Sequence, residues 1–328
     1  MGKTGQEVTV WTDTGHVELV HTVLDLMGSA IRPIGVGGPR NAAVDRLAKI
    51  FNCTRLDDPR QLLVERPATF LLVATTESID HEHICGAANG GTVVLTMEPL
   101  ATELSQLLAL RFVARNIIRV PGFMYSPGAV RATDPREEIG TRRTMAYFSY
   151  VPSQVGSLFG RLLDAWTAML WFGPLPETID ASLTGSRTSI PENLSDITGV
   201  VSAHARMASD SAAVIHVADR AGHFGRCLHV LGADGQLCIT DGGYQLSDRH
   251  GNEMDRAGQN EQVMGTADLV AVQWQALLDR TDLKRPEVAE TDALACCLAC
   301  LLSARTGQPE SPQSILQMSG LSPHDSSG

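Results

Sequence analysis

The chain has 328 residues and a formal net charge of −11. This length predicts two domains, and the hydrophobic fraction of 43% is ordinary for a soluble globular protein. An acidic chain repels phosphate backbones, so we expect no nucleic-acid partner. The sequence has no run of about 18 apolar residues and no signal-peptide pattern, and its seven cysteines are an odd number. We therefore expect a cytoplasmic protein with reduced thiols and no membrane span.

The first 120 residues alternate between strand-like and helix-like segments. Apolar, β-favouring runs predict strands at 8–11, 31–36, 69–74, 92–95 and 117–120. Helices are predicted after the first strand, at 42–51, before the fourth strand and at 102–115. This alternation indicates a parallel sheet wound with helices on both faces, so we predict a Rossmann-like nucleotide-binding domain over residues 6–121.

The pattern changes after residue 121, where we predict an α+β domain over 122–318. Strands are expected at 145–150, 200–207, 212–218, 225–231 and 235–240, with short turns between the later ones. Helices are expected at 157–172, 268–278 and about 287–303, a long loop at 174–200, and a disordered tail at 319–328. These segments predict an open, mainly antiparallel sheet with helices on one face.

Several stretches resemble the GFO/IDH/MocA oxidoreductases. "FLLVATTESIDHEHI", from Phe70, is similar to that family's strand and turn, and "AANGGTVVLTMEPLA" follows it in the place of "ALxAGKHVLCEKPLA". "GRCLHVLGADGQLCITDGGYQLSDRHGN", from Gly225, resembles strands of the family's second domain, and "LLSARTGQPESP" resembles its C-terminal helix. The resemblance covers nearly the whole chain. It implies an NAD or NADP cofactor, a small sugar-like molecule, and a homo-oligomer formed through the C-terminal sheet.

The turn after the first strand departs from the family pattern. The fold normally has G-x-G-x-x-G there, but Thr12, Thr14 and Val17 stand at the glycine positions. Asp13 also brings a negative charge to the place expected for a pyrophosphate. Two interpretations stay open. The turn is either a shifted loop that uses Gly15 and the helix N-terminus as an anion site, or a plain turn that holds no dinucleotide.

The second strand lacks the acidic residue that binds the ribose of NAD, since residues 35–40 contain none. Arg40 is either a partner for the 2′-phosphate of NADP or a solvated arginine at a helix start. If a cofactor binds, the resemblance implies candidate contacts in the turns that follow the strands. These candidates are Thr12, Thr14, Gly15, His16, Arg40, Thr75, Thr76, Glu98 and Pro99.

The catalytic residues that the resemblance implies are altered. Met97-Glu98-Pro99 stands in the place of "EKP", so an anion replaces the lysine that polarises the reacting oxygen. Glu98 is the one catalytic candidate, as a general base, and its alternative is a solvated or salt-bridged carboxylate. Pro99 preserves the turn.

The family's D-x-G-x-H-x-x-D helix corresponds to 157–172. Leu163 falls on the histidine and Trp166 on the second aspartate, and 84–203 contains no histidine. We expect Asp164 to cap or face solvent.

No metal site is expected. His81 and His83 are two apart and would face different ways on a helix. Cys297 and Cys300 lie in an apolar helix, where cysteine is a small buried residue. The histidines of the second domain are expected at the surface, namely His204, His216, His223 and His229.

The favoured hypothesis is a catalytically degenerate protein that acts as a binding or assembly subunit. Its uncovered sheet face, with contributions from 214–217 and 227–231, would form the homo-oligomer. The alternative is an active NAD(P)-dependent oxidoreductase that acts on a sugar or polyol. The first rests on the joint loss of glycines, lysine and histidine, the second on whole-chain resemblance.

Overall fold

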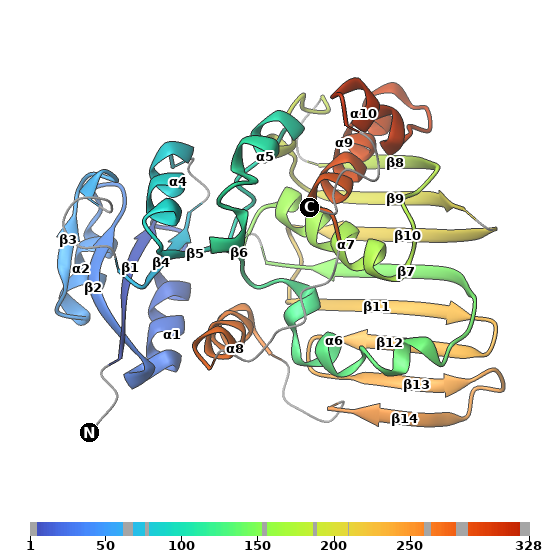
Figure 1. Ribbon diagram of the computed structural model, residues 1–328, viewed down its shortest axis with the longest axis horizontal. Coiled ribbons are helices and arrows are strands. Elements are labelled where there is room, and N and C mark those ends of the chain that lie inside the picture. The colour runs from blue at the N-terminus through green and yellow to red at the C-terminus, as the bar shows by residue number, and fades with distance from the viewer. Residues whose placement is uncertain are drawn as a thin grey trace. The chain divides into compact units, whose positions relative to one another are not determined.

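The computed structural model describes residues 5–61, 68–75, 79–152, 156–185, 189–208, 210–258, 264–279 and 288–321. The chain divides into two compact units. Unit 1 consists of Met1–Leu100, Leu108–Pro121 and Gly265–Asp282, and unit 2 of Ala101–Leu107, Gly122–Met264 and Leu283–Gly328. Figure 1 labels the helices and strands of both units.

Unit 1 is built on a six-stranded sheet in the order β3-β2-β1-β4-β5-β6, in which every neighbouring pair is parallel. Its strands are β1 Gln6–Thr12, β2 Ile31–Gly37, β3 Thr54–Leu56, β4 Phe70–Ala74, β5 Val93–Thr96 and β6 Ile117–Arg119. Its helices are α1 Val17–Met27, α2 Ala42–Ile50, α4 His81–Asn89 and α8 Thr266–Leu278, while α5 Leu104–Leu110 crosses the sequence boundary between the units. The predicted Rossmann-type sheet is confirmed.

The strand order places a switch point between β1 and β4. The chain leaves β1 toward β2 on one side and later returns to β4 on the other. In open parallel sheets, ligands bind outside the carboxyl ends of the strands at such a point. The turns after β1 and β4 are therefore the first place to look for a site in unit 1.

Helix α8 belongs to unit 1, although the sequence analysis assigned all residues from 122 to 318 to the second domain. It packs against α1. Trp274 is fully buried, and its ring lies 5.7 Å from that of Phe70. In a sequence, an apolar helix face predicts that the helix packs against a core, but it does not predict which domain provides that core. The difference at residues 265–282 arises from this.

Unit 2 is built on an eight-stranded sheet in the order β14-β13-β12-β11-β7-β10-β9-β8. All neighbouring strands are antiparallel except β7 and β10, which are parallel. The strands are β7 Arg142–Tyr150, β8 Thr178–Thr184, β9 Val200–Met207, β10 Ser211–Ala218, β11 Gly225–Gly232, β12 Gly235–Thr240, β13 Tyr244–Asp248 and β14 Glu253–Ala257. The helices are α6 Pro127–Arg131, α7 Leu158–Phe172, α9 Glu290–Thr306 and α10 Pro312–Met318. The predicted open, mainly antiparallel sheet is confirmed.

Short 3-10 helices connect several of these elements. They span Gly28–Ala30, Ala114–Asn116, Phe123–Tyr125, Pro135–Glu137 and Leu194–Asp196. No described helix combines the length and the hydropathy that crossing a bilayer requires.

Some predicted bounds were wrong in unit 2. Strand β8 lies inside the predicted loop 174–200. The Pro, Gly, Ser and Thr content of that stretch favoured a loop, although Thr178–Thr184 itself alternates polar and apolar residues. Helix α9 ends at Thr306 rather than 303, and Gly307 terminates it at φ 67°. Of the predicted disordered tail, residues 322–328 lie outside the described part, and Leu321 N–H still donates to the Leu316 carbonyl.

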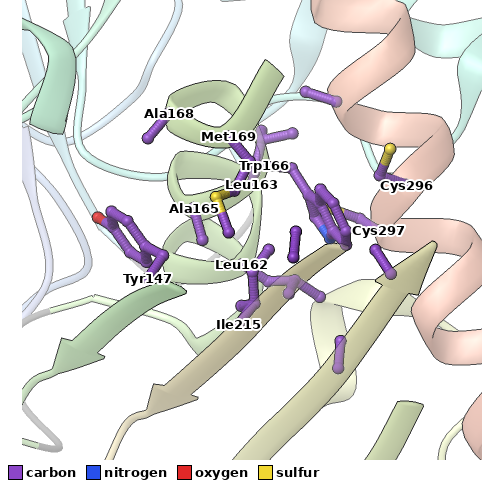
Figure 2. Packing of buried hydrophobic residues seen from close by; sticks show 14 of the residues in the cluster. Tyr147, Leu162, Leu163, Ala165, Trp166, Ala168, Met169, Ile215, Cys296 and Cys297 are labelled. Carbon is purple, nitrogen blue, oxygen red and sulfur yellow. The ribbon is translucent and has the colours of Figure 1, made fainter. Parts of the chain in front are cut away.

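The core of unit 2 lies between one sheet face and helices α6, α7 and α9 (Figure 1). Trp166 of α7 is fully buried, and its ring points toward α9, where Cys296 and Cys297 also lie in the cluster (Figure 2). The indole Nε1 of Trp166 donates to Cys300 Sγ at 3.3 Å. The α9 cysteines are therefore buried packing residues, as the sequence indicated.

Along each central strand of unit 2, side chains alternate between this core and the opposite face. On β11, Arg226, Leu228 and Val230 are buried, whereas His229 and Leu231 are exposed. The opposite face also carries half-buried aromatic residues of β7, namely Phe148 and Tyr150. The ladder thus brings apolar and titratable side chains together on the face turned away from the core.

Candidate functional site

The turn between β1 and α1 contains a buried carboxylate. Asp13 is 6% exposed, and its Oδ1 accepts the backbone N–H of His16 at 3.1 Å. Its Oδ2 accepts the hydroxyl of Thr75, which follows β4, at 3.1 Å. The carboxylate therefore joins the two strands of the switch point. It also takes up an N–H at the N-terminal end of α1, where a nucleotide-binding fold offers its donors to phosphate.

His16 completes this cluster. Its Nδ1 lies 2.8 Å from Asp13 Oδ1, and the residue is only 3% exposed. Its Nε2 has no hydrogen-bond partner among the described residues. Since the Asp13 carboxylate is an acceptor, Nδ1 carries the proton in this contact. His16 thus holds the Asp13 carboxylate by hydrogen bonds from both its backbone N–H and its ring.

Of the other candidate residues in the turn between β1 and α1, one is buried and two are exposed. Thr12 is fully buried, and its hydroxyl donates to the Asp13 carbonyl at 3.2 Å. Gly38, at φ 146°, lies so close that a Cβ there would be 1.9 Å from the Thr12 carbonyl oxygen. Thr14 and Gly15 are exposed. The backbone packing around Thr12 is therefore fixed, and only Thr14 and Gly15 present this turn to an incoming molecule.

The candidates after the later strands lie at the same edge of the sheet. Thr75 is 5% exposed and is held by Asp13, whereas Thr76 lies outside the described residues. Glu98 and Pro99 are half-buried. The Glu98 carbonyl accepts the Thr96 hydroxyl at 2.5 Å.

Two further predicted positions are explained by local bonds. His81 contacts the Leu100 carbonyl through Nε2 and so ties the start of α4 to the segment after β5. Arg40 is exposed and lines a groove beside α2, together with Lys49 and Arg55. Arg55 is already committed to Asp45 at 2.9 Å and to the Gly38 carbonyl at 2.9 Å. Arg40, in contrast, has no hydrogen-bond or ion-pair partner among the described residues.

Unit 2 contains a buried charge cluster that the sequence analysis missed. The side chain of Arg226 is fully buried between two carboxylates, with Asp164 at 2.9 Å and Asp241 at 2.6 Å. Asp164 Oδ2 also accepts the Tyr147 hydroxyl at 3.2 Å, and its Oδ1 accepts the Phe123 N–H at 2.9 Å. The expectation that Asp164 faces solvent was wrong, because the residue is 3% exposed.

The charges of this cluster shift one another's pKa values. Burial opposes the charge on Arg226, but Asp241 and Asp164 together raise the pKa of Arg226 above its usual value. Burial raises the pKa of Asp241, and Arg226 opposes that shift. Burial, followed by the charge of Asp164, raises the pKa of Tyr147 well above 10. Tyr147 therefore stays neutral, and its hydroxyl donates a hydrogen bond to Asp164.

The helix that the resemblance assigns to the catalytic histidine supplies no proton-transfer group at the expected positions. Leu163 is 4% exposed and Trp166 is fully buried, both within the hydrophobic core. Asp164 is bound to Arg226 within α7's own unit. The sequence could have flagged this cluster only through its two aspartates and one arginine on separate elements, a pattern that is common at surfaces.

No protein-family model matches the chain, and no curated protein matches it in sequence. Solved structures do match over nearly the full length. Levoglucosan dehydrogenase, in complex with NADH and levoglucosan, is similar with a TM-score of 0.71 and 13% identity, covering 93% of this chain and 99% of that one. An oxidoreductase from Agrobacterium radiobacter, in complex with NAD+, L-tartaric acid and magnesium, has a TM-score of 0.71 and 15% identity, covering 95% and 100%.

A myo-inositol dehydrogenase from Corynebacterium glutamicum has a TM-score of 0.66 and 15% identity, covering 94% of this chain and 98% of that one. At such identities the likeness shows the fold. It does not transfer an activity.

Proposed function

We propose that this chain, which has the fold of the GFO/IDH/MocA-type dehydrogenases, does not transfer hydride and instead acts as a binding and assembly subunit. One observation carries the proposal. The buried carboxylate of Asp13 accepts the N–H of His16 at the start of α1. A pyrophosphate needs the donors of that helix end, and here the chain supplies its own anion.

The negative charge of Asp13 also disfavours pyrophosphate binding, in addition to its occupation of the His16 N–H. Two unit charges 4 Å apart interact by about 1 kcal/mol in water and by about 4 kcal/mol near a protein surface. Asp13 would repel a phosphate by an energy in that range. His16 offsets part of this repulsion because its Nδ1 lies 2.8 Å from the carboxylate. The balance still disfavours a dianionic pyrophosphate at this turn.

The second support is the absence of the expected proton-transfer chemistry. Glu98 stands where the resemblance expects a lysine, and it is an acceptor where a donor is needed. Asp164, the ionisable residue of α7 beside Arg161, is bound to Arg226 and Phe123 N–H. Neither group supplies the cationic donor that the resemblance expects beside a substrate oxygen.

The assembly part of the proposal rests on the uncovered face of the unit 2 sheet. Its outward side chains include Ala146, Phe148 and Tyr150 on β7 and Val214 on β10. We propose that a second copy of this chain covers them, because an apolar face of this kind is costly in water. Light scattering by the pure protein measures the number of copies.

A titration with NADH and NADPH tests the cofactor part. We expect no saturable change in cofactor fluorescence and no thermal shift with either cofactor, because a bound ligand would raise the apparent stability by about 2.7 kcal/mol at a hundredfold excess over Kd. The variant Asp13→Asn removes the charge with little change of shape, so it should gain affinity. Asp25→Asn, on the exposed side of α1, is the matched control and should leave affinity unchanged.

Saturable binding of either cofactor by the unaltered protein, together with polyol-dependent turnover, would overturn the proposal. So would equal responses of the Asp13→Asn and Asp25→Asn variants, since the carboxylate would then not be the cause.

The second candidate is an active NAD(P)-dependent oxidoreductase that acts on a sugar or polyol. Two observations favour it: Thr14 and Gly15 are exposed at the end of β1, and Arg40 is exposed after β2. If this second candidate is correct, Arg40→Ala should weaken the binding of NADPH more than the binding of NADH, because the guanidinium pairs with the 2′-phosphate. Arg46→Ala, an exposed arginine of α2, is the control and should change neither.

A further inference from the structure

Two cysteines and a histidine meet on the face of the unit 2 sheet that is turned away from the core. Cys227 and His229 lie two apart on β11, so they share a face. Cys238 of β12 lies directly opposite His229 in the antiparallel register. Three residue types that bind soft metal ions are therefore neighbours through strand pairing alone.

Their ligand atoms converge. Cys227 Sγ lies 3.2 Å from His229 Nε2 and 3.5 Å from Cys238 Sγ, and Cys238 Sγ lies 3.8 Å from the same Nε2. Zinc binds thiolate at about 2.3 Å and imidazole at about 2.0–2.1 Å in a tetrahedron, which separates two sulfurs by about 3.8 Å and sulfur from nitrogen by about 3.6 Å. The observed triangle has the dimensions of one face of such a tetrahedron.

The imidazole is oriented for this role by its surroundings. The ring of Phe148, on the neighbouring strand β7, lies edge-on to that of His229 with centroids 6.4 Å apart. Nε2, rather than Nδ1, is the nitrogen within reach of both sulfurs. A metal ligand of this kind uses one nitrogen and leaves the other free to take a proton.

The two thiols lie within hydrogen-bond distance of each other. The hydrogen bond between them, followed by burial, raises the pKa of Cys227, whereas the same hydrogen bond lowers the pKa of Cys238. A cation that binds both sulfurs displaces their protons to solvent.

We propose that Cys227, His229 and Cys238 form a zinc site with three protein ligands. In the single chain both cysteines are half-buried and His229 is exposed, so three protein ligands leave the fourth position of the tetrahedron to water. The site is distinct from the β1–α1 turn and does not depend on whether a dinucleotide binds there. It was not expected from the sequence, where no C-x-x-C or H-x-x-x-H spacing connects the three residues.

Metal content of the full-length protein tests the proposal. Protein that has been reduced, stripped with a chelator and then given zinc chloride should retain one zinc per chain after desalting, as measured by mass spectrometry of the metal. Cobalt(II) given in place of zinc should produce a thiolate-to-cobalt charge-transfer band and the visible bands of a tetrahedral complex. Absence of stoichiometric zinc from the reduced protein would overturn the proposal.

Single variants identify the ligands. Cys227→Ser, Cys238→Ser and His229→Gln should each weaken zinc binding by about tenfold or more. Cys53→Ser and Cys85→Ser alter half-buried cysteines of unit 1 and should retain zinc. Urea denaturation of each variant verifies that it is folded. If the ligand variants hold as much zinc as the controls, the metal binds elsewhere and the assignment is wrong.

A disulfide between Cys227 and Cys238 is the competing outcome. Counting free thiols before and after reduction detects it. If the reduced protein binds no zinc but forms this disulfide readily in air, the zinc proposal is wrong and the two cysteines are a redox pair instead.

Discussion

Asp164 occupies the helix in which the family resemblance expects a catalytic histidine, and its surroundings explain what the residue does instead. Its carboxylate accepts hydrogen bonds from Arg226, Tyr147 and the N–H of Phe123. Arg226 also lies over the rings of Phe123 and Phe224, each at 5.5 Å from the ring centroid. A buried arginine of this kind is tolerable only while its carboxylates remain, so Asp164 contributes to folding.

Replacing Asp164 by alanine should therefore lower the free energy of unfolding by about 3–5 kcal/mol, because Arg226 loses a buried partner. Urea denaturation measures the change. The control is Glu192→Ala, which removes an exposed pair with Arg305 at 3.5 Å and should cost less than about 1 kcal/mol. Similar losses in the two variants would show that the buried pair carries no special weight.

At the scale of elements, helix α8 shows how a segment distant in sequence completes a sheet domain. Its residues Val270, Ala271 and Trp274 join the core cluster formed by β1, α1 and β4. Gln273 Nε2 donates to the Arg119 carbonyl at 3.2 Å, which connects the helix to the end of β6. Unit 1 is therefore incomplete when it is cut after β6.

Trp274→Ala should destabilise unit 1 by about 3–5 kcal/mol, the usual cost of deleting a large buried aromatic side chain. Val272→Ala, on the same helix but 39% exposed, is the matched control and should cost less than about 1 kcal/mol. Urea denaturation, monitored by far-ultraviolet circular dichroism rather than by tryptophan fluorescence, gives both free energies of unfolding. If the two variants behave alike, the contact between α8 and α1 is not a packing contact in solution.

At the scale of the molecule, the net charge of −11 and the uncovered sheet face act in opposite directions. The charge opposes association through self-repulsion, whereas the apolar centre of the face favours it. The proposed assembly requires the apolar term to exceed the repulsion. At physiological salt, charges farther apart than about 8–10 Å are screened from one another. Added salt should therefore weaken the repulsion and strengthen association.

Val214→Asp should shift the protein toward the monomer, because the face would bury an unpaired carboxylate on association. Val130→Asp is the control, since Val130 lies on α6 and is 47% exposed. Light scattering coupled to gel filtration reports the mass of each variant. A monomeric mass for the unaltered protein at all concentrations tested would contradict the assembly proposal.

Much of the fold could be read from local patterns. Strands 200–207 and 235–240 were predicted at their observed bounds, because alternating apolar residues and a glycine turn mark them directly. β8 carries the polar–apolar alternation of a strand but lies in a stretch rich in Pro, Gly and Ser that predicted a loop. The short, exposed β14 has no apolar alternation to detect. A strand is predictable when its own residues carry its burial pattern and its surroundings do not favour a loop, and each of these two strands fails one of these conditions.

The sequence by itself determined the two sheet types, the glycine-poor first turn and the anion at position 98. Only the tertiary structure decided that Asp13 is bound by Thr75, that α8 covers α1, and that Cys227 and Cys238 reach the same histidine. The reason is that propensity and periodicity act over a few neighbouring residues. Contacts between distant segments depend on strand order and register, which pairing across the whole sheet selects.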